Sequence, residues 1–267
     1  MDNQQYFLSI DNGTQSVRAM VFDGQGQLIA KSKIDIEPYF SDQPGWAEQH
    51  AEYFWDALCK ACQALWPLLP IPKESIAAVS VTTQRATAIA MGADNQPLRP
   101  AISWLDQRQV ETKPALGALE SALFTLVRAK PLVDLMHKQA EANWIAQNEP
   151  NIWDKVHKFV LLSGYHNYKL TGEYKDAIAS TVGFLPFDYK TQQWADKRDW
   201  KWRAMPITQE MLPEVLPAGA ELGRITLQAA TETGIPKGLP LIASGSDKAC
   251  EVLGTGCIDS QTGSLSY

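Results

Sequence analysis

An aspartate near the start of the chain is followed by residues suited to binding phosphate. Asp11 follows the apolar run at residues 6–10, and the turn after it reads Asn12, Gly13, Thr14, Gln15 and Ser16. Backbone N–H groups at such a turn can face an anion, and a carboxylate can hold Mg²⁺ through water. Glycine at position 13 permits backbone geometry that a Cβ would obstruct. The segment predicts either a site for a magnesium-bound phosphate or an ordinary hairpin with a polar turn.

A second carboxylate stands near the other end of the chain. Asp247 follows the apolar strand predicted at residues 241–243, and residues 248–253 have a pattern typical of a helix that ends at Gly254. A carboxylate at such a junction can cap the helix, or it can project into a crevice above the sheet. Asp247 is therefore either a helix cap or a candidate general base.

Two more groups of polar residues follow predicted strands. Gln84 and Arg85 come after the strand predicted at residues 76–81, and Trp104 and Asp106 come after a short strand that follows Pro100. A sugar or polyol needs paired polar groups for its hydroxyls and a flat apolar surface for its carbon face. The four residues predict such a pocket, although core packing could account for Trp104 and helix capping for Asp106.

These residues would be positioned by an α/β sheet. Apolar and alternating runs predict strands at 6–10, 18–22, 28–36, 76–81 and 86–91, with a helix at about 51–66. Residues 107–170 are helix-rich, with Leu116, Leu119, Leu123 and Leu126 at helical spacing, and predict an inserted helical layer on one face of the sheet. The aromatic-rich segment 184–202 is consistent with a lid, a partner surface or an irregular cover.

Composition favours a small-molecule partner. The 267 residues include 45% hydrophobic residues and carry a net charge of −6 without a basic run, which argues against nucleic acid or an anionic membrane as partner. No eighteen apolar residues run together, and the polar start predicts a cytoplasmic protein. Cys59 and Cys62 lie on the apolar stripe of a predicted helix, so buried packing is favoured over a zinc or redox role. The histidines show no metal-ligand spacing.

The motifs, taken together, resemble the FGGY family of carbohydrate kinases, in the fold group of actin, Hsp70 and hexokinase. The resemblance rests on D-x-G-T-x-S-x-R from Asp11 to Arg18 and on G-x-D-x-x-x-x-x-L-G-x-G around Asp247. It extends along the whole chain through Pro44-Gly-Trp-Ala-Glu48, Thr83-Gln-Arg85, Ala101-Ile-Ser-Trp-Leu-Asp-Gln-Arg108 and Tyr168-Lys-Leu-Thr-Gly-Glu173. It implies an RNase H-like, actin-like ATPase domain whose mixed five-stranded sheet is flanked by helices and carries a helical insertion.

The resemblance also implies roles for the residues. Asp247 would be the general base, Asp11 would orient Mg²⁺, and Arg18 with the turn at residues 12–16 would lie near the ATP phosphates. Arg18 is equally well explained as a solvated or salt-bridged side chain. Gln84, Arg85, Trp104 and Asp106 would bind the sugar or polyol. Residues 1–267 would form the N-terminal domain of an ATP-dependent kinase, inactive without a C-terminal nucleotide-binding domain absent from this chain.

Two departures from the family leave the substrate open. Arg85 is followed by Ala86 and Thr87, whereas the family's glycerol kinases have an acidic residue after this arginine. The xylulokinases usually have Met-His where this chain has Gln84 and Arg85. A non-catalytic sugar-binding relative and an actin-like ATPase remain alternatives, and self-association into a homodimer is also open.

Overall fold

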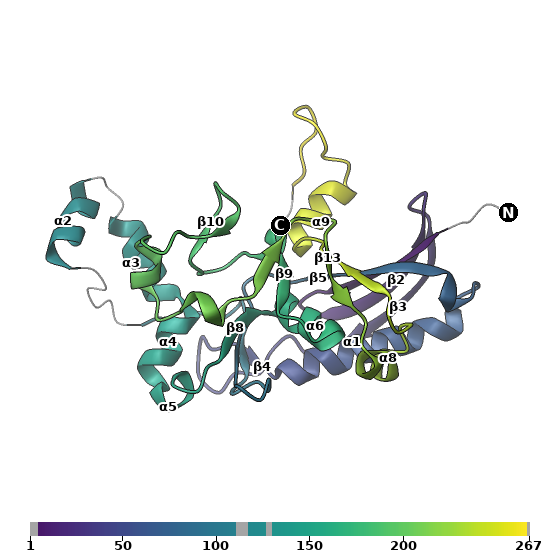
Figure 1. Cartoon of the computed structure of the whole chain (residues 1–267), viewed down its shortest axis with the longest axis horizontal. Coiled ribbons are helices and arrows are strands. Elements are labelled where there is room, and N and C mark those ends of the chain that lie inside the picture. The colour runs from purple at the N-terminus through teal and green to yellow at the C-terminus, as the bar shows by residue number, and fades with distance from the viewer. Residues whose placement is uncertain (1–4, 111–116, 127–129, 266–267) are drawn as a thin grey trace.

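The main sheet is mixed and has the strand order β13-β14-β5-β1-β2-β3 (Figure 1). The computed structural model describes residues 5–110, 117–126 and 130–265. β1 pairs in parallel with β5, which pairs in parallel with β14, whereas β1-β2, β2-β3 and β13-β14 are antiparallel. The strands are β1 (Tyr6–Asn12), β2 (Ser16–Asp23), β3 (Leu28–Asp35), β5 (Ile76–Thr83), β13 (Glu221–Arg224) and β14 (Pro240–Ile242).

Side-chain alternation on β1 separates the core from the site. Leu8 and Ile10 are buried on one face of the sheet, and Ser9 and Asp11 lie on the other. Helix α1 (Ala51–Leu65) covers the apolar face, as its sequence pattern predicts. Three other helices pack around this core or beside the sheet: α6 (Leu162–Thr171), α8 (Leu227–Thr233) and α9 (Asp247–Gly254).

The two cysteines of α1 have the predicted packing role. Cys59 and Cys62 are free and buried in the main core. Burial raises the pKa of the Cys59 thiol to about 12 and raises that of Cys62 further, so both thiols stay protonated at neutral pH. Among the described residues, no group of three or more His, Cys, Asp or Glu side chains could hold a metal.

The main sheet has six strands where five are predicted, and the strand predicted at residues 86–91 is not among them. The additional strand is β13. Its short sequence, with charged residues at both ends and a glycine inside, gives little strand signal, and its pairing with β14 shifts register between Glu221 and Gly223. The pairing itself is non-local, so the sequence of β13 alone does not reveal it.

A second, four-stranded sheet lies beside the main one, in the order β4-β7-β6-β8. Its strands are β4 (Glu48–Gln49), β7 (Ala101–Ile102), β6 (Ala88–Met91) and β8 (Lys158–Leu161). Short pieces complete the chain: η1 (Trp66–Leu68), η2 (Lys73–Ser75), β9 (Lys175–Ala177), η3 (Ile178–Ser180), α7 (Lys201–Ala204), η4 (Gln209–Met211) and β12 (Glu214–Leu216).

Of the helices in the segment predicted to cover the sheet, α6 packs against the main sheet, whereas four others pack in a different place. Figure 1 shows α2 (Ala118–Leu126), α3 (Lys130–Gln139), α4 (Glu141–Asn148) and α5 (Pro150–Trp153) at the far end of the molecule, beyond the second sheet. Trp144 and Ile145 of α4 are buried in a second core there. Helical periodicity identifies an apolar face but not the surface that covers it. Leu126 is exposed, and Leu116 and the side chains of Leu119 and Leu123 lie outside the described residues.

The aromatic-rich segment is mainly a cover for the second core. Its hairpin, β10 (Phe187–Asp188) with β11 (Gln193–Trp194), buries Phe187, and Trp194 and Trp202 pack against that core. The indole of Trp194 donates to the carbonyl oxygen of Pro213. This arrangement favours the irregular cover among the three interpretations.

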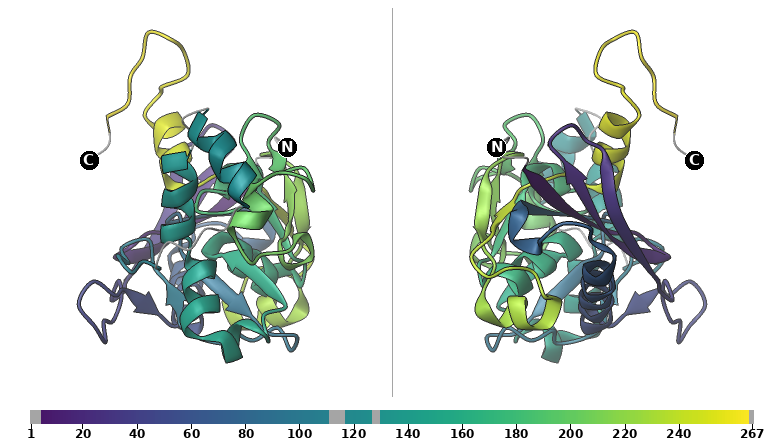
Figure 2. Two further views of the ribbon diagram at one scale, coloured as in Figure 1. Left: turned by 90° about the vertical axis from the view of Figure 1, so that its left-hand side faces the viewer. Right: turned by 90° about the vertical axis from the view of Figure 1, so that its right-hand side faces the viewer.

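Helix α9 and the segment after it project from the body of the molecule (Figure 2). α9 has no buried residue, and Leu253 near its end is exposed. In the part of the chain that the structure describes, every helix is too short or too polar to cross a membrane.

Candidate active site

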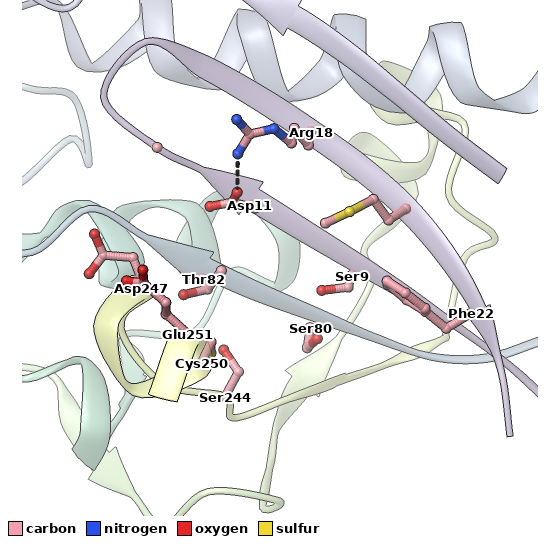
Figure 3. A pocket seen from close by; sticks show the side chains of 12 residues that line it. Ser9, Asp11, Arg18, Phe22, Ser80, Thr82, Ser244, Asp247, Cys250 and Glu251 are labelled. Carbon is pink, nitrogen blue, oxygen red and sulfur yellow. Dashed lines mark hydrogen bonds and ion pairs between the residues drawn. The ribbon is translucent and has the colours of Figure 1, made fainter. Parts of the chain in front are cut away.

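Asp11 and Asp247, which are 236 positions apart in sequence, line the same cavity of about 580 Å³ (Figure 3). Asp11 reaches it from β1, and Asp247 reaches it from the first residue of α9. In the parallel pairing of β1 with β5, Asp11 is the register partner of Thr82, which also lines the cavity. The site therefore lies at the carboxyl ends of two parallel strands, where α/β sheets commonly bind ligands.

Hydrogen bonds to neighbouring elements fix the loop that carries Asp247. The Thr82 hydroxyl donates to the carbonyl oxygen of Gly245 at 2.7 Å, and the Ser244 hydroxyl donates to that of Val81 at 2.6 Å. The backbone N–H of Ser246 donates to the carbonyl oxygen of Ala179 at 3.3 Å. The end of β5 and the turn η3 thus hold the start of α9 at the cavity.

Asp247 is not the N-cap of α9. The N-cap is Ser246, so the capping interpretation fails on position, although Asp247 Oδ1 accepts the backbone N–H of Lys248 at 2.7 Å. The Asp247 side chain is 34% exposed, and Arg85 Nε lies 3.5 Å from Oδ1. Arg85 precedes Ala86, whose φ of 51° lies in the left-handed region. The carboxylate is therefore open to a ligand and has a cation beside it.

Asp11 forms an ion pair across the hairpin. Arg18 Nη1 lies 2.7 Å from Asp11 Oδ2, and both side chains line the cavity. The salt-bridged interpretation of Arg18 is thus confirmed, in a position that also faces a ligand. Asp11 Oδ1 makes no hydrogen bond with the described residues. One free carboxylate oxygen at an open cavity fits a Mg²⁺ ion that keeps most of its waters and takes phosphate oxygens.

The turn after β1 only partly matches its predicted role. Gly13 lines the cavity, but its φ is not positive and an added Cβ would come no closer than 3.6 Å to another atom, the Ser16 carbonyl oxygen. The expectation that the chain's own backbone requires glycine there is therefore wrong. Ser16 and Asn12 are buried, whereas Thr14 is partly exposed and Gln15 is exposed. The Ser16 and Asn12 side chains thus cannot face a phosphate in this arrangement.

Trp104 links the turn to the predicted substrate residues. Its indole N–H is shared between Thr14 Oγ1 at 3.1 Å and Gln84 Oε1 at 3.2 Å. Trp104 is 50% exposed, so the core-packing alternative is wrong and a ring face is available to a ligand. Gln84 is buried, and its backbone N–H donates to the backbone carbonyl oxygen of Asn12. Its Nε2 has no partner among the described residues.

Asp106 has a structural role in place of the predicted substrate contact. Its side chain is 3% exposed, pairs with Arg108 at 2.7 Å and accepts the backbone N–H of Ala47 at 2.6 Å. Arg108 also pairs with Glu48 at 2.7 Å, and its guanidinium lies between the rings of Trp46 and Trp144, 4.0 and 4.5 Å from their centroids. Because these donors occupy the Asp106 carboxylate, it can neither bind a sugar nor cap a helix.

The sequence interpretation missed His166, which supports the turn at residues 12–16 from behind. His166 is fully buried, and its Nε2–H donates to Asn12 Oδ1 at 2.9 Å, while Nδ1 has no partner among the described residues. Burial lowers the pKa of this histidine to about 3. A polar residue inside the helical segment before Gly172 was the only available signal, because its partner lies 154 positions away.

Acid should therefore destabilise the fold through His166. In the unfolded chain a histidine takes up a proton as the pH falls through about 6.5, whereas the buried ring stays neutral down to about 3. The unfolded state binds more protons in this window, so the free energy of unfolding should fall by up to about 1.4 kcal/mol per pH unit. His166→Gln keeps a donor for Asn12 and should flatten the slope measured by urea unfolding. The matched control is His157→Gln, which replaces an exposed histidine and should leave the slope unchanged. Equal slopes in the two variants would contradict the prediction.

The architecture is that of an actin-like ATPase domain. A xylulose kinase from Lactobacillus acidophilus superposes with a TM-score of 0.78 at 20% identity, covering 96% of this chain and 51% of that one. A glycerol kinase from Plasmodium falciparum superposes with a TM-score of 0.74 at 21% identity, covering 96% of this chain and 51% of that one.

The chain belongs to the FGGY family of carbohydrate kinases, because the family's N-terminal domain matches residues 6–254. A protein described as an uncharacterized sugar kinase, YgcE, of Escherichia coli is 29% identical over 264 residues, 99% of this chain and 46% of that protein. A xylulose kinase of Lactococcus lactis is 26% identical over 98% of this chain and 51% of its own length. The chain thus spans about half the length of these relatives.

Proposed function

We propose that this chain is the substrate-binding half of an ATP-dependent kinase that phosphorylates a hydroxyl group of a sugar or polyol. The observation that carries the proposal is the shared cavity: two carboxylates from opposite ends of the sequence line one space at the carboxyl ends of parallel strands. The relatives' descriptions as xylulose, glycerol and sugar kinases support the same reaction class.

Each part of phosphoryl transfer has a candidate residue. Asp247 would accept the proton of the attacking hydroxyl, and Arg85 beside it would hold that carboxylate and an adjacent hydroxyl in place. Trp104 would lie against the carbon face of the sugar. Asp11 would hold Mg²⁺, which would screen the charge of the ATP phosphates next to Arg18 and the Gly13–Thr14 backbone.

The nucleotide-binding part of the active site would come from another domain. The half of each relative that this chain does not cover is the expected source of the nucleotide pocket, and closure of the two halves would exclude water from the site. We place the protein in the cytoplasm, with homodimer formation a prediction that sedimentation equilibrium of the intact gene product would test.

Sugar binding by Trp104 tests the proposal without nucleotide. A thermal-shift panel of pentuloses, hexuloses, aldoses and polyols should contain at least one ligand that raises the melting temperature of this chain. Trp104→Ala should weaken binding of that ligand about tenfold, because the exposed ring contributes contact area at little cost to the fold. Tyr189→Ala, which removes an exposed ring elsewhere, is the matched control and should bind normally.

Other outcomes would favour the alternatives. Sugar binding by the intact gene product without ATP turnover would indicate a non-catalytic relative, and ATP hydrolysis without affinity for any member of the panel would indicate an actin-like ATPase. Ala86 lacks the carboxylate found next to this arginine in glycerol kinases, so we expect a ligand other than glycerol to give the largest thermal shift.

A further inference from the structure

A second cavity, of about 490 Å³, lies away from the two carboxylates. Its walls come from the end of the β10–β11 hairpin, the turn η4, the strand β12 and the first residue of η3. It shares no lining residue with the candidate active site. Nothing in the proposed kinase reaction uses this space.

The lining of this second cavity combines polar and apolar groups and is almost uncharged. Gln192, Gln193 and Gln209 supply amide groups that both donate and accept hydrogen bonds, and Glu214 adds one carboxylate. Trp194 and Leu212 contribute apolar surface. The described lining residues include no Lys, Arg or His, so the cavity offers an anion no counter-charge. Amides beside an indole suit the hydroxyls and carbon face of a neutral polyhydroxylated molecule.

The apolar wall is held firmly. Trp194 donates its indole N–H to the carbonyl oxygen of Pro213 at 2.8 Å and contacts the ring of the buried Phe187, with centroids 5.4 Å apart. Leu212 is buried in the second core. These contacts hold Trp194 and Leu212 in place, so this part of the cavity wall is formed before binding.

Residues one or two positions from two lining residues bond to the segment that carries Asp247. Ile178 lines the cavity, and the next residue, Ala179, accepts the backbone N–H of Ser246. Pro217 also lines the cavity and opens a turn in which Gly219 donates to the carbonyl oxygen of Ala243 at 2.9 Å. A ligand that restrains both walls would also restrain residues 243–247.

We infer that this cavity is a second binding site, for a neutral polyhydroxylated molecule of monosaccharide size, and that its occupancy stiffens the segment carrying Asp247. The bound molecule is an effector and not the phosphoryl acceptor, since the described lining has one carboxylate but no positively charged group that could hold the phosphates of a donor. The inference goes beyond the proposed function, and binding at the second cavity does not depend on it.

The test uses this chain with the first site disabled by Trp104→Ala and Asp247→Asn. Glucose, xylose, sorbitol and the acidic sugar gluconate are titrated separately, and the NMR resonance of the Trp194 indole N–H is followed. At least one neutral ligand should shift this resonance saturably, and gluconate should bind more weakly than that ligand. Adding Gln193→Ala and Gln209→Ala should weaken binding about tenfold through lost hydrogen bonds. The matched variant Gln25→Ala/Gln261→Ala, at exposed turn positions, should bind like its parent.

Several results would overturn the inference. One is the absence of a saturable shift in a protein whose spectrum shows it to be folded. The others are equally tight binding of gluconate and unchanged affinity after the Gln193 and Gln209 substitutions. Stiffening is measured separately: hydrogen exchange at the Ser246 amide should slow about threefold or more at saturation, because that N–H bonds to η3. Unchanged exchange would overturn the coupling. The proposed function is judged in the unmodified chain by sugar binding that depends on Trp104, so the two failures can be told apart.

Discussion

Asp247→Asn should lower the rate of phosphoryl transfer by the intact gene product about a hundred- to ten-thousandfold. The substitution keeps the size of the side chain and removes the proton acceptor. Sugar affinity should change only a few-fold, because an amide can still accept a hydrogen bond from the substrate and Arg85 remains in place. The loss should therefore appear in kcat with little change in KM, provided that KM reports binding.

The measurement is a coupled ADP-release assay with the sugar that gives the largest thermal shift. Asp35→Asn is the matched control, since Asp35 is an exposed carboxylate at the end of β3 that pairs with Lys33 outside the cavity. It should retain full turnover. Turnover of the Asp247 variant within threefold of the parent enzyme would remove Asp247 from the role of general base.

Arg108→Ala should have the largest effect on stability, a loss of about 3–5 kcal/mol in the free energy of unfolding. The Arg108 side chain is 3% exposed, and its guanidinium pairs with two buried carboxylates, Asp106 and Glu48. Its removal leaves both with fewer partners in a place that water does not reach, and it empties the space between Trp46 and Trp144.

Urea unfolding of this chain, followed by tryptophan fluorescence, measures the loss. Arg224→Ala is the matched control, because Arg224 is 61% exposed and pairs with Glu221 at the surface, where such pairs contribute less than about 1 kcal/mol. A change below 1 kcal/mol for Arg108→Ala would show that the buried network contributes little. Since Asp106 anchors the segment after Trp104, the variant should also bind the sugar more weakly.

Local patterns predicted the part of the fold that positions the two acids. Strands β1, β2, β3 and β5 and helix α1 have strong alternating or helical apolar patterns, so the sequence indicates them directly. Asp11 and Asp247 each lie at or just after the end of a buried strand, which is a general feature of sites in α/β sheets. Their placement in one cavity follows from the parallel pairing of β5 with both β1 and β14.

The features that the sequence did not predict depend on contacts between distant residues. Judged by residue type alone, the Asp106 carboxylate could bind a sugar. In the structure it is occupied by the Arg108 guanidinium and the backbone N–H of Ala47. His166 meets Asn12 from a helix 154 positions away. The inserted helices pack on a sheet whose two-residue strands, β4 and β7, give almost no pattern of their own. In each case the sequence shows the residue type but not the distant residue that contacts it.

The one-sided anchoring of α9 has a mechanical consequence. Hydrogen bonds of Ser244, Gly245 and Ser246 hold the start of the helix in place. The far end near Leu253 contributes nothing to either core. The exposed last turn of α9 lacks packing that would stabilise it in water, so α9 should fray from Gly254 inward. Residues 255–265 can therefore change position without moving the carboxylate of Asp247, which is held by the start of the helix.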